Sequence, residues 1–213
     1  MPRPLRRPQR KPLRPRTSHQ PILPNLHDAL KGARRIALVG VGSELRGDDA
    51  VGVLVARSMA TWCARTRSRR LVAFDTGTAP ENFSGEIIRS KPDCVIFLDA
   101  AHLPGREPGS VEIIPPEEIE GLSFSTHMLP APIFLDYLEK ATGCRSLVMG
   151  IQIEQKDVLA ELSPSVKSAA HRLAAAFRRA LVPRARPAKS KAKPRPSRQS
   201  TKAKRVSRRP KSK

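Results

Sequence analysis

The sequence has too few cysteines to build a disulfide framework or a thiolate metal cage. Only Cys63, Cys94 and Cys144 occur among 213 residues, and no two of them form a C-x-x-C pair. Frameworks and cages of these kinds need more cysteines at closer spacing. We therefore expect three small core side chains in a protein of a reducing compartment.

Long hydrophobic runs are also absent. No apolar stretch approaches the roughly 20 residues that a membrane-spanning helix requires. The N-terminal region is basic, but no apolar segment of a secretory signal follows it. Five prolines between positions 2 and 15 oppose an amphipathic targeting helix. These absences predict a cytoplasmic protein without membrane insertion.

Acidic residues are missing from both ends of the chain. Residues 1–20 hold seven Arg/Lys, residues 183–213 hold fourteen, and the nineteen basic residues between them match all nineteen acids, so the net charge of +21 belongs to the ends. We expect residues 1–22 and 183–213 to be disordered tails, because such compositions cannot bury a core. One folded domain then covers residues 23–182. Without aromatic side chains, the tails suit only unspecific contact with polyanions.

Short apolar runs alternate with helical patterns along the neutral middle. Runs typical of buried strands cover residues 36–41, 71–74, 94–98 (ending at Asp99) and 147–151. Helices are expected at about residues 48–64, 83–91, 129–142 and from Ser163-Pro164 to the residues before Pro183. Residues 110–114 follow a connection too short for a crossover helix, which predicts an antiparallel edge strand. The pattern predicts a three-layer α/β/α fold with a mostly parallel, five-stranded sheet and one antiparallel strand.

The helical patterns also predict which side chains face the core. In the last helix, Ser163 is expected as the N-cap and Pro164 as part of the first turn. The apolar stripe of that helix consists of Val166, Ala169, Ala170, Leu173, Phe177 and Leu181. In the helix at about residues 129–142, the predicted inner face consists of Ile133, Phe134, Tyr137 and Leu138.

A glycine-rich loop follows the first predicted strand. The spacing Gly42-x4-Gly47 matches the start of a P-loop, but Asp48 and Asp49 stand where Lys and Ser or Thr would serve phosphate and magnesium. Arg46 replaces the third glycine of the dinucleotide fingerprint. Since two carboxylates repel a phosphate and attract a cation, the loop predicts a metal or another positive centre.

Further polar residues follow the other predicted strands. Asp75 follows the second strand, Asp99 follows the third, and His127 lies in a loop before a helix. Ligands of open α/β sheets gather outside the carboxyl ends of the strands. Two carboxylates and an imidazole suit a divalent ion such as zinc, nickel or manganese, with a remaining position for water or substrate. The absence of H-E-x-x-H excludes a zincin-type protease.

Each of these residues also has a purely structural interpretation. Asp48 is better explained as a helix cap, which leaves Asp49 free to point elsewhere. An Asp at a strand end, such as Asp99, is often a turn residue that satisfies local N–H groups, and an isolated His127 is more often exposed than a ligand. His102, which could compete as a ligand, is interpreted as a loop residue, and His171 as a surface or packing residue. From the residues alone, we predict an α/β domain with a metal site.

Five segments in order resemble the hydrogenase maturation proteases, which complete the large subunit of nickel–iron hydrogenases. They are Gly40-Val41-Gly42-Ser43 with Arg46-Gly47-Asp48-Asp49-Ala50-Val51-Gly52, Asp75-Thr76-Gly77-Thr78-Ala79-Pro80-Glu81-Asn82, Leu98-Asp99-Ala100, Ser125-Thr126-His127-Met128-Leu129-Pro130 and Met149-Gly150-Ile151-Gln152. The resemblance covers about residues 35–181. The second and fourth segments look most like the branch that serves hydrogenase 3-type enzymes. Ser43 and Ala50 depart from the usual Asn and Gly.

The resemblance implies an endopeptidase whose catalytic, metal-contacting residues are Asp49, Asp99 and His127. It makes Asp75, with Gly42 and Gly47, candidates for substrate contact or support. The implied partner is the hydrogenase large-subunit precursor, which brings nickel on its cysteines and loses a short C-terminal peptide. Cadmium or zinc are expected substitutes in vitro, and the protein is expected to be a monomer. Two alternatives stay open: a non-catalytic metal-binding scaffold, and a nucleic-acid-associated protein that acts through its tails.

Overall fold

A five-stranded sheet forms the centre of the protein. The computed structural model describes residues 24–114, 119 and 131–182. The sheet order is β2-β1-β3-β5-β4, with β4 antiparallel at one edge and the other pairs parallel. The strands are β1 (Ile36–Gly40), β2 (Leu71–Asp75), β3 (Cys94–Ala101), β4 (Val111–Ile114) and β5 (Arg145–Gln152). The predicted sheet and its antiparallel edge strand are confirmed.

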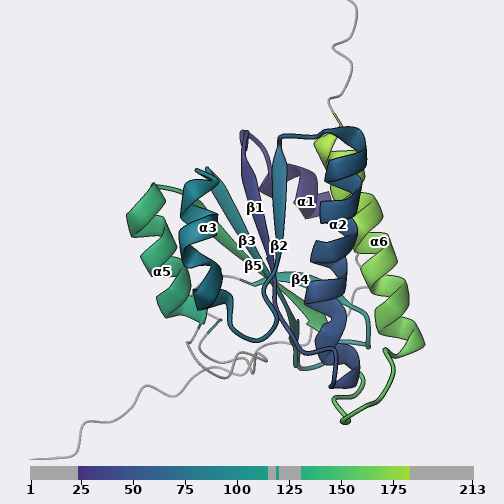
Figure 1. The fold of residues 1–213 in the computed structure, drawn as a ribbon. Coiled ribbons are helices and arrows are strands. Elements are labelled where there is room, and N and C mark those ends of the chain that lie inside the picture. Colours follow the sequence, from purple (N-terminus) through teal and green to yellow (C-terminus); the bar gives the residue numbers. More distant parts are fainter. Residues whose placement is uncertain (1–23, 115–118, 120–130, 183–213) are drawn as a thin grey trace, which may run out of the picture. The chain divides into compact units, whose positions relative to one another are not determined.

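Helices cover both faces of this sheet, as Figure 1 shows. Helices α2 (Val51–Thr66) and α6 (Pro164–Leu181) lie on one face with the short α1 (Pro24–Ala29). Helices α3 (Ser84–Arg89) and α5 (Ala131–Thr142) lie on the other. Two 3-10 turns, η1 (Gly47–Ala50) and η2 (Pro80–Phe83), precede α2 and α3. The fold is therefore the predicted three-layer α/β/α arrangement.

The central strand β3 contributes side chains to two separate cores. Cys94, Ile96, Leu98 and Ala100 pack under α2 and α6, whereas Val95, Phe97 and Ala101 pack under α3 and α5. The ring of Phe97 meets that of Phe134 from α5 edge-on, with centroids 6.5 Å apart. Because successive side chains alternate between faces, the position of Asp99 belongs to the face covered by α3 and α5.

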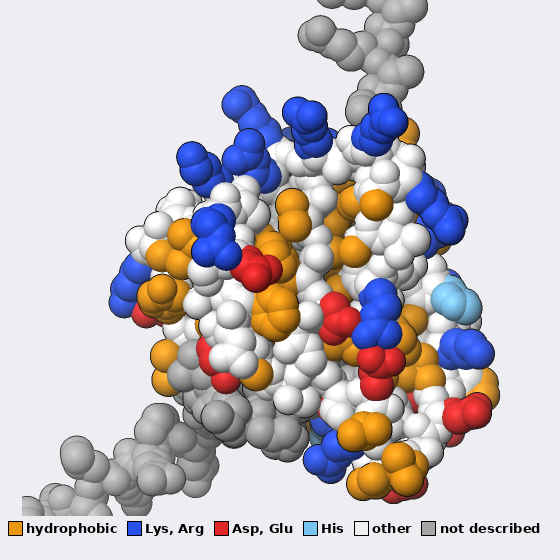
Figure 2. Space-filling model, viewed as in Figure 1, with side chains coloured by type: hydrophobic (Ala, Val, Ile, Leu, Met, Phe, Trp, Pro, Cys, Tyr) orange, Lys and Arg blue, Asp and Glu red, His pale blue; other side chains and the backbone are white. Residues whose placement is uncertain are grey.

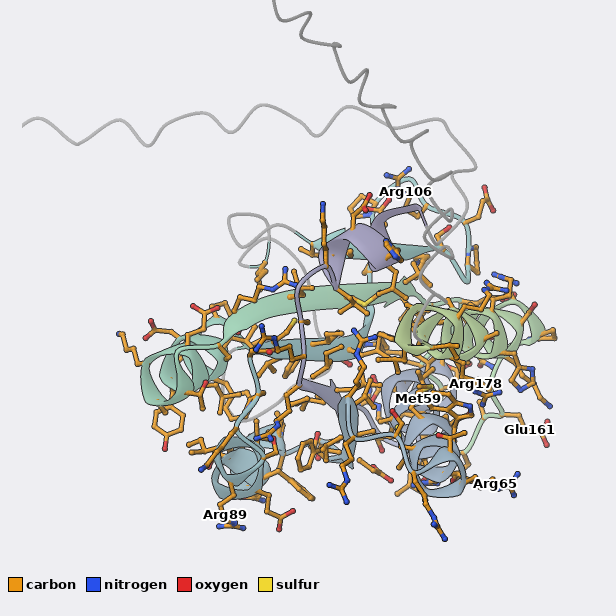
Figure 3. All side chains as sticks on the ribbon, turned by 90° about the horizontal axis from the view of Figure 1, so that it is seen from above. Met59, Arg65, Arg89, Arg106, Glu161 and Arg178 are labelled. Carbon is orange, nitrogen blue, oxygen red and sulfur yellow. The ribbon has the colours of Figure 1, made fainter. Side chains whose placement is uncertain are left out.

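Helices α2 and α6 pack directly against each other. Figure 3, viewed from above, places Met59 of α2 and Arg178 of α6 at this contact. Met59 is fully buried, and an Arg178 Nη2–H group donates a hydrogen bond of 2.9 Å to Ser58 Oγ. The predicted stripe of α6 is confirmed, since its six apolar side chains are all buried.

Two predicted details of the elements are wrong. Ile133 and Tyr137 of α5 are 56% and 51% exposed, and the buried face is Ala131, Phe134, Leu135 and Leu138. These four follow the i, i+3, i+4, i+7 spacing of a single helical stripe, which the predicted set does not. Strand β3 continues past Asp99 to Ala101, because its ladder with β5 extends to the pair Ala101↔Gln152. Asp99 is therefore a strand residue and not a turn residue.

Charged side chains are distributed unevenly over the domain. Figure 2 shows Lys and Arg side chains gathered along the upper end of the view. Exposed cations at the amino ends of the parallel strands include Arg34, Arg35, Arg69, Lys91 and Arg145. The buried acids among the described residues lie toward the carboxyl ends instead. Asp48 and Asp49 lie in η1, which follows β1, and Asp99 lies two residues before the end of β3. The carboxyl end of the sheet is thus the end that suits a cation.

The predicted tails, residues 1–22 and 183–213, lie wholly outside the described residues. The chain divides into a unit of Met1–Pro183 and a second unit of Arg184–Lys213, and the second unit lies wholly outside them. Among the helices that are described, none has the length and apolar character to cross a membrane.

Helix α2 approaches the sheet through a glycine that leaves no room for a side chain. A Cβ atom on Gly52 would lie 2.3 Å from the carbonyl oxygen of Val41 and 2.4 Å from that of Leu98. These oxygens belong to backbone and cannot move aside as a flexible side chain would. The start of α2 is therefore held against β1 and β3 by a direct backbone approach.

Gly52→Ala should lower the free energy of unfolding by about 1–3 kcal/mol, because the added methyl group overpacks this contact. Urea denaturation would measure the change. Gly85→Ala is the matched control, since its Cβ would meet only the flexible end of Arg89 at 3.3 Å. Equal stabilities of the two variants would contradict the described contact.

Candidate functional site

The glycine-rich loop joins β1 to η1 at the carboxyl end of the sheet. Gly42 has a φ of 136°, and a Cβ atom there would lie 1.7 Å from the carbonyl oxygen of Asp49. Its N–H donates to Gly77 O over 2.9 Å, which ties this loop to the loop after β2. Gly42 therefore has a structural reason to be glycine: it lets the loop fold back onto the residues that follow it. Gly47 opens η1 with a φ of 52°.

Asp49 is a buried carboxylate with one oxygen left without a hydrogen bond. The residue is 1% exposed, and Oδ2 accepts a hydrogen bond of 2.9 Å from the Ser43 N–H. Oδ1 accepts no hydrogen bond among the described residues, although the ammonium of Lys156 lies 3.3 Å away as an ion pair. A buried carboxylate with an unbonded oxygen is suited to a cation.

Asp48 is saturated with hydrogen bonds and does not cap a helix. Its Oδ2 accepts from the N–H groups of Glu154 (2.8 Å) and Gln155 (3.0 Å), and from the Ser163 hydroxyl (2.7 Å). Its Oδ1 accepts from the Ser163 N–H over 2.7 Å. Neither η1 nor α2 has a side-chain cap, so the predicted capping role is wrong. The carboxylate instead pins both ends of the segment between β5 and α6.

The predicted N-cap position of Ser163 is confirmed, but the side chain of Ser163 bonds elsewhere. Ser163 precedes Pro164 at the expected start of α6, but its side chain makes no capping hydrogen bond to that helix. The hydroxyl donates to Asp48 instead. A fully buried carboxylate needs every available donor, and this need outweighs the modest gain from capping.

Asp99 lies in β3, one residue after the backbone contact of Leu98 with the start of α2. The residue is fully buried in β3, opposite Gly150 of β5. The carbonyl of the preceding Leu98 accepts a hydrogen bond of 2.9 Å from the Val41 N–H, and the same oxygen faces Gly52 of α2. Asp99 is therefore one residue beyond the point where β3 contacts both the glycine-rich loop and α2.

The third predicted ligand, His127, lies outside the described residues. Within residues 24–114, 119 and 131–182, no three His, Cys, Asp or Glu side chains converge in a way that could hold a metal ion. The structure thus describes Asp49 and Asp99, and a three-residue metal site that includes His127 remains a prediction.

Asp75, a candidate for substrate contact or support, takes part in an exposed ion-pair network. Arg57 of α2 donates to Asp75 Oδ2 from Nε (3.0 Å) and Nη2 (2.6 Å), and to Glu44 from Nη1 (3.1 Å) and Nη2 (2.7 Å). Hydrogen bonds from Arg57 lower the pKa of Glu44, and bonds to both acids raise the pKa of Arg57. The network connects α2, the glycine-rich loop and the end of β2.

Several other residues have the structural roles that the sequence predicted. His102 and His171 are exposed, and all three cysteines are free and buried. Burial raises the pKa of Cys94 to about 11. Ser43 Oγ accepts a hydrogen bond of 3.3 Å from the Leu45 N–H. This is a turn contact that an Asn side chain can also make, so Ser43 is a mild departure from the family pattern.

Two functional-site contacts were missed from the sequence. Lys156 reaches Asp49, and Ser163 reaches Asp48, both from the distant segment between β5 and α6. The polar composition of residues 154–157 indicates a loop, but no local spacing connects it to the adjacent aspartates. A groove of about 640 Å³ between α2 and α6 is a separate feature, since neither Asp49 nor Asp99 is among its lining residues.

The fold and the site define a class of protein: a three-layer α/β domain with buried carboxylates at the carboxyl end of a mostly parallel sheet. The sequence profile of the hydrogenase maturation protease family (HycI) matches residues 55–179, more than half of the chain. The chain therefore belongs to the hydrogenase maturation protease family, which confirms the resemblance seen in its motifs. The matched range begins after Asp49 and includes Asp99 and His127.

Individual relatives agree with this assignment. The chain is 34% identical to the hydrogenase 3 maturation protease of Escherichia coli K12 over 116 residues, which are 54% of this chain and 70% of that protein. The crystal structure of the [NiFe] hydrogenase maturation protease HycI from Thermococcus kodakarensis has a TM-score of 0.66 at 35% identity, covering 73% of this chain and 97% of that one. The solution structure of the endopeptidase HycI from Escherichia coli has a TM-score of 0.57 at 29% identity, covering 66% and 87%.

Asp48→Asn should lower the free energy of unfolding by about 2–4 kcal/mol, because an amide NH₂ would face N–H donors in a buried site. Thermal and urea denaturation would measure this loss. The control is Asp157→Asn in the same segment, where the side chain is exposed and the change should stay within about 0.5 kcal/mol. If both variants were as stable as the wild type, Asp48 would not be the anchor described.

Proposed function

We propose that this protein is an endopeptidase that removes a short C-terminal peptide from the nickel-loaded precursor of a nickel–iron hydrogenase large subunit. The family assignment supports proteolysis in hydrogenase maturation. The Escherichia coli relative is named for hydrogenase 3, which favours a precursor of that type. The proposal also includes recognition of the nickel already bound to the precursor, and this part rests on Asp49, Asp99 and His127.

The observation that carries this proposal is that Asp49 Oδ1 accepts no hydrogen bond, although it is paired with the ammonium of Lys156. Asp48, Asp49 and Asp99 are the only buried acids among the described residues. Since an unpaired buried carboxylate is costly, each requires a partner. Asp48 has four donors within the fold, whereas Asp49 keeps Oδ1 without a hydrogen bond. An oxygen in this state is ready to bind a metal ion that arrives with the substrate.

The topology supports a contribution from His127 near Asp99. Only two residues separate α5 from β5, so α5 ends at the amino ends of the strands and begins at their carboxyl ends. His127 precedes Ala131, the first residue of α5, by four residues, which limits their Cα separation to about 14 Å. Helix α5 also packs on the face of the sheet to which the position of Asp99 belongs. The imidazole is thus within chain reach of this end of the sheet.

The proposed set balances the charge of the precursor's metal. Two ionised aspartates match one divalent cation, and a neutral histidine adds a nitrogen donor. By completing the coordination of the precursor's nickel, Asp49, Asp99 and His127 fix the adjacent peptide bond relative to the protein. The donor set is compatible with two routes: polarisation of the scissile carbonyl, or activation of a water molecule with an aspartate as the base.

Asp49→Asn and His127→Ala should each reduce cleavage of the nickel-loaded precursor at least about 100-fold, because each removes one contact that positions the scissile bond. Mass spectrometry of the precursor would follow the loss of the C-terminal peptide, and thermal unfolding would verify the fold. His102→Ala is the matched control, because His102 is an exposed histidine close to Asp99 in sequence. Normal cleavage by either site variant would overturn the assignment of that residue.

A precursor without nickel should resist cleavage by the wild-type protein, because the site residues would then have no cation to recognise. The same mass measurement on nickel-free and nickel-loaded precursor separates three outcomes. Loss of mass only with nickel supports the proposal, and equal cutting of both forms contradicts metal recognition. Binding of the precursor without any mass loss would identify a non-catalytic metal-binding scaffold.

A further inference from the structure

We infer that Lys156 competes with a precursor-borne metal for Asp49, because its ammonium stays paired with Asp49 Oδ1 until that metal displaces it. This inference rests on the function proposed above and assigns a role to a residue outside the predicted three. Lys156 belongs to the segment between β5 and α6 and not to any of the motifs that predicted the site.

The contact between Lys156 and Asp49 is close and asymmetric. The Lys156 Nζ lies 3.3 Å from Asp49 Oδ1, the same oxygen that accepts no hydrogen bond. The Asp49 side chain is 2% exposed, whereas that of Lys156 is 29% exposed. The ammonium therefore neutralises the carboxylate by charge without completing a hydrogen bond to it. Such a contact is easier to exchange than a saturated one such as that of Asp48.

The backbone next to Lys156 is fixed, while its side chain has room to leave. Asp48 accepts hydrogen bonds from the N–H groups of Glu154 and Gln155 immediately before it, and Ser163 anchors the far end of the segment. Lysine carries its charge on a flexible four-carbon stem, and this stem is partly exposed. Asp48 thus holds the segment in place, and Asp49 pairs with the ammonium of Lys156 from the same segment.

Displacement follows from electrostatics. A divalent ion bound at Asp49 Oδ1 and an ammonium a few ångströms away repel each other strongly in a buried site. A free metal ion has to overcome this repulsion with its own binding energy alone. A metal held by the precursor is helped by the contacts of the polypeptide that carries it. Lys156 therefore lowers the affinity of the site for either form of the metal by the same factor, so that tight binding requires the added contacts of the precursor, and the return of the ammonium after cleavage favours release of the product.

A purely structural ion pair is the competing interpretation. In that case Lys156 would only stabilise the fold by compensating a buried charge, and removing it would lower stability without affecting metal affinity. The displacement mechanism makes the opposite prediction, because removal of the competing cation should strengthen metal binding. The two interpretations are therefore separated by one binding measurement.

The test is calorimetric titration of the full-length protein with cadmium chloride, at physiological ionic strength. Lys156→Met keeps the length and apolar stem of the side chain and removes its charge. We expect cadmium to bind this variant roughly five- to tenfold more tightly than the wild type, the scale of a partly exposed ion pair. Lys167→Met is the matched control: Lys167 is an exposed lysine in α6 that lines the separate groove, so its removal should leave the Kd unchanged.

Unchanged or weaker cadmium binding by Lys156→Met, in a variant that unfolds at the wild-type temperature, would overturn the inference. If the variant loses stability, Lys156→Arg provides the second measurement, because it keeps the charge and should bind cadmium as the wild type does. Tight binding by Lys156→Arg comparable to that of a charge-free variant would also refute displacement. Asp49→Asn separates this inference from the proposed function: if it binds cadmium normally, the proposed site itself fails, whatever Lys156 does.

Discussion

The burial of two adjacent aspartates is the constraint on which the rest of this structure depends. Asp48 and Asp49 are removed from water at the start of α2, so each requires compensation from within the fold. Asp48 obtains it from four donors in the segment between β5 and α6. Asp49 obtains a single N–H from Ser43 and one nearby ammonium. Asp48 therefore anchors the segment between β5 and α6, and Asp49 keeps one oxygen without a hydrogen bond, which can accept a ligand.

The sheet topology brings the remaining site residues to the same end of the domain. Because β1, β3 and β5 are parallel neighbours, the glycine-rich loop, Asp99 and the Lys156 segment all lie at their carboxyl ends. The tight approach of Gly52 to β1 and β3 fixes α2 against this end. Exposed arginines lie at the opposite ends of the strands. Fold and charge thus distinguish the carboxyl end of the sheet from the opposite end.

Local patterns were enough to predict the layers, the sheet and the antiparallel edge strand, because alternation and run length reflect burial directly. They failed where distant segments compete for the same polar group. Asp48 looks like a cap in sequence, yet donors more than 100 residues away bind it. Ser163 stands at the right place for a cap and bonds to Asp48 instead. Asp99 resembled a strand end because its charge interrupts an apolar run, although the ladder with β5 continues past it.

The central question about this site is whether one divalent ion contacts Asp49, Asp99 and His127 together. Anomalous X-ray diffraction from crystals of the protein soaked with cadmium tests this most directly, because the ion's position is observed independently of activity. If the three residues bind one ion, we expect one strong anomalous peak within bonding distance of Asp49 Oδ1, Asp99 and the His127 imidazole. A fully occupied peak at another site, with Asp49 still paired only with Lys156, would contradict this expectation.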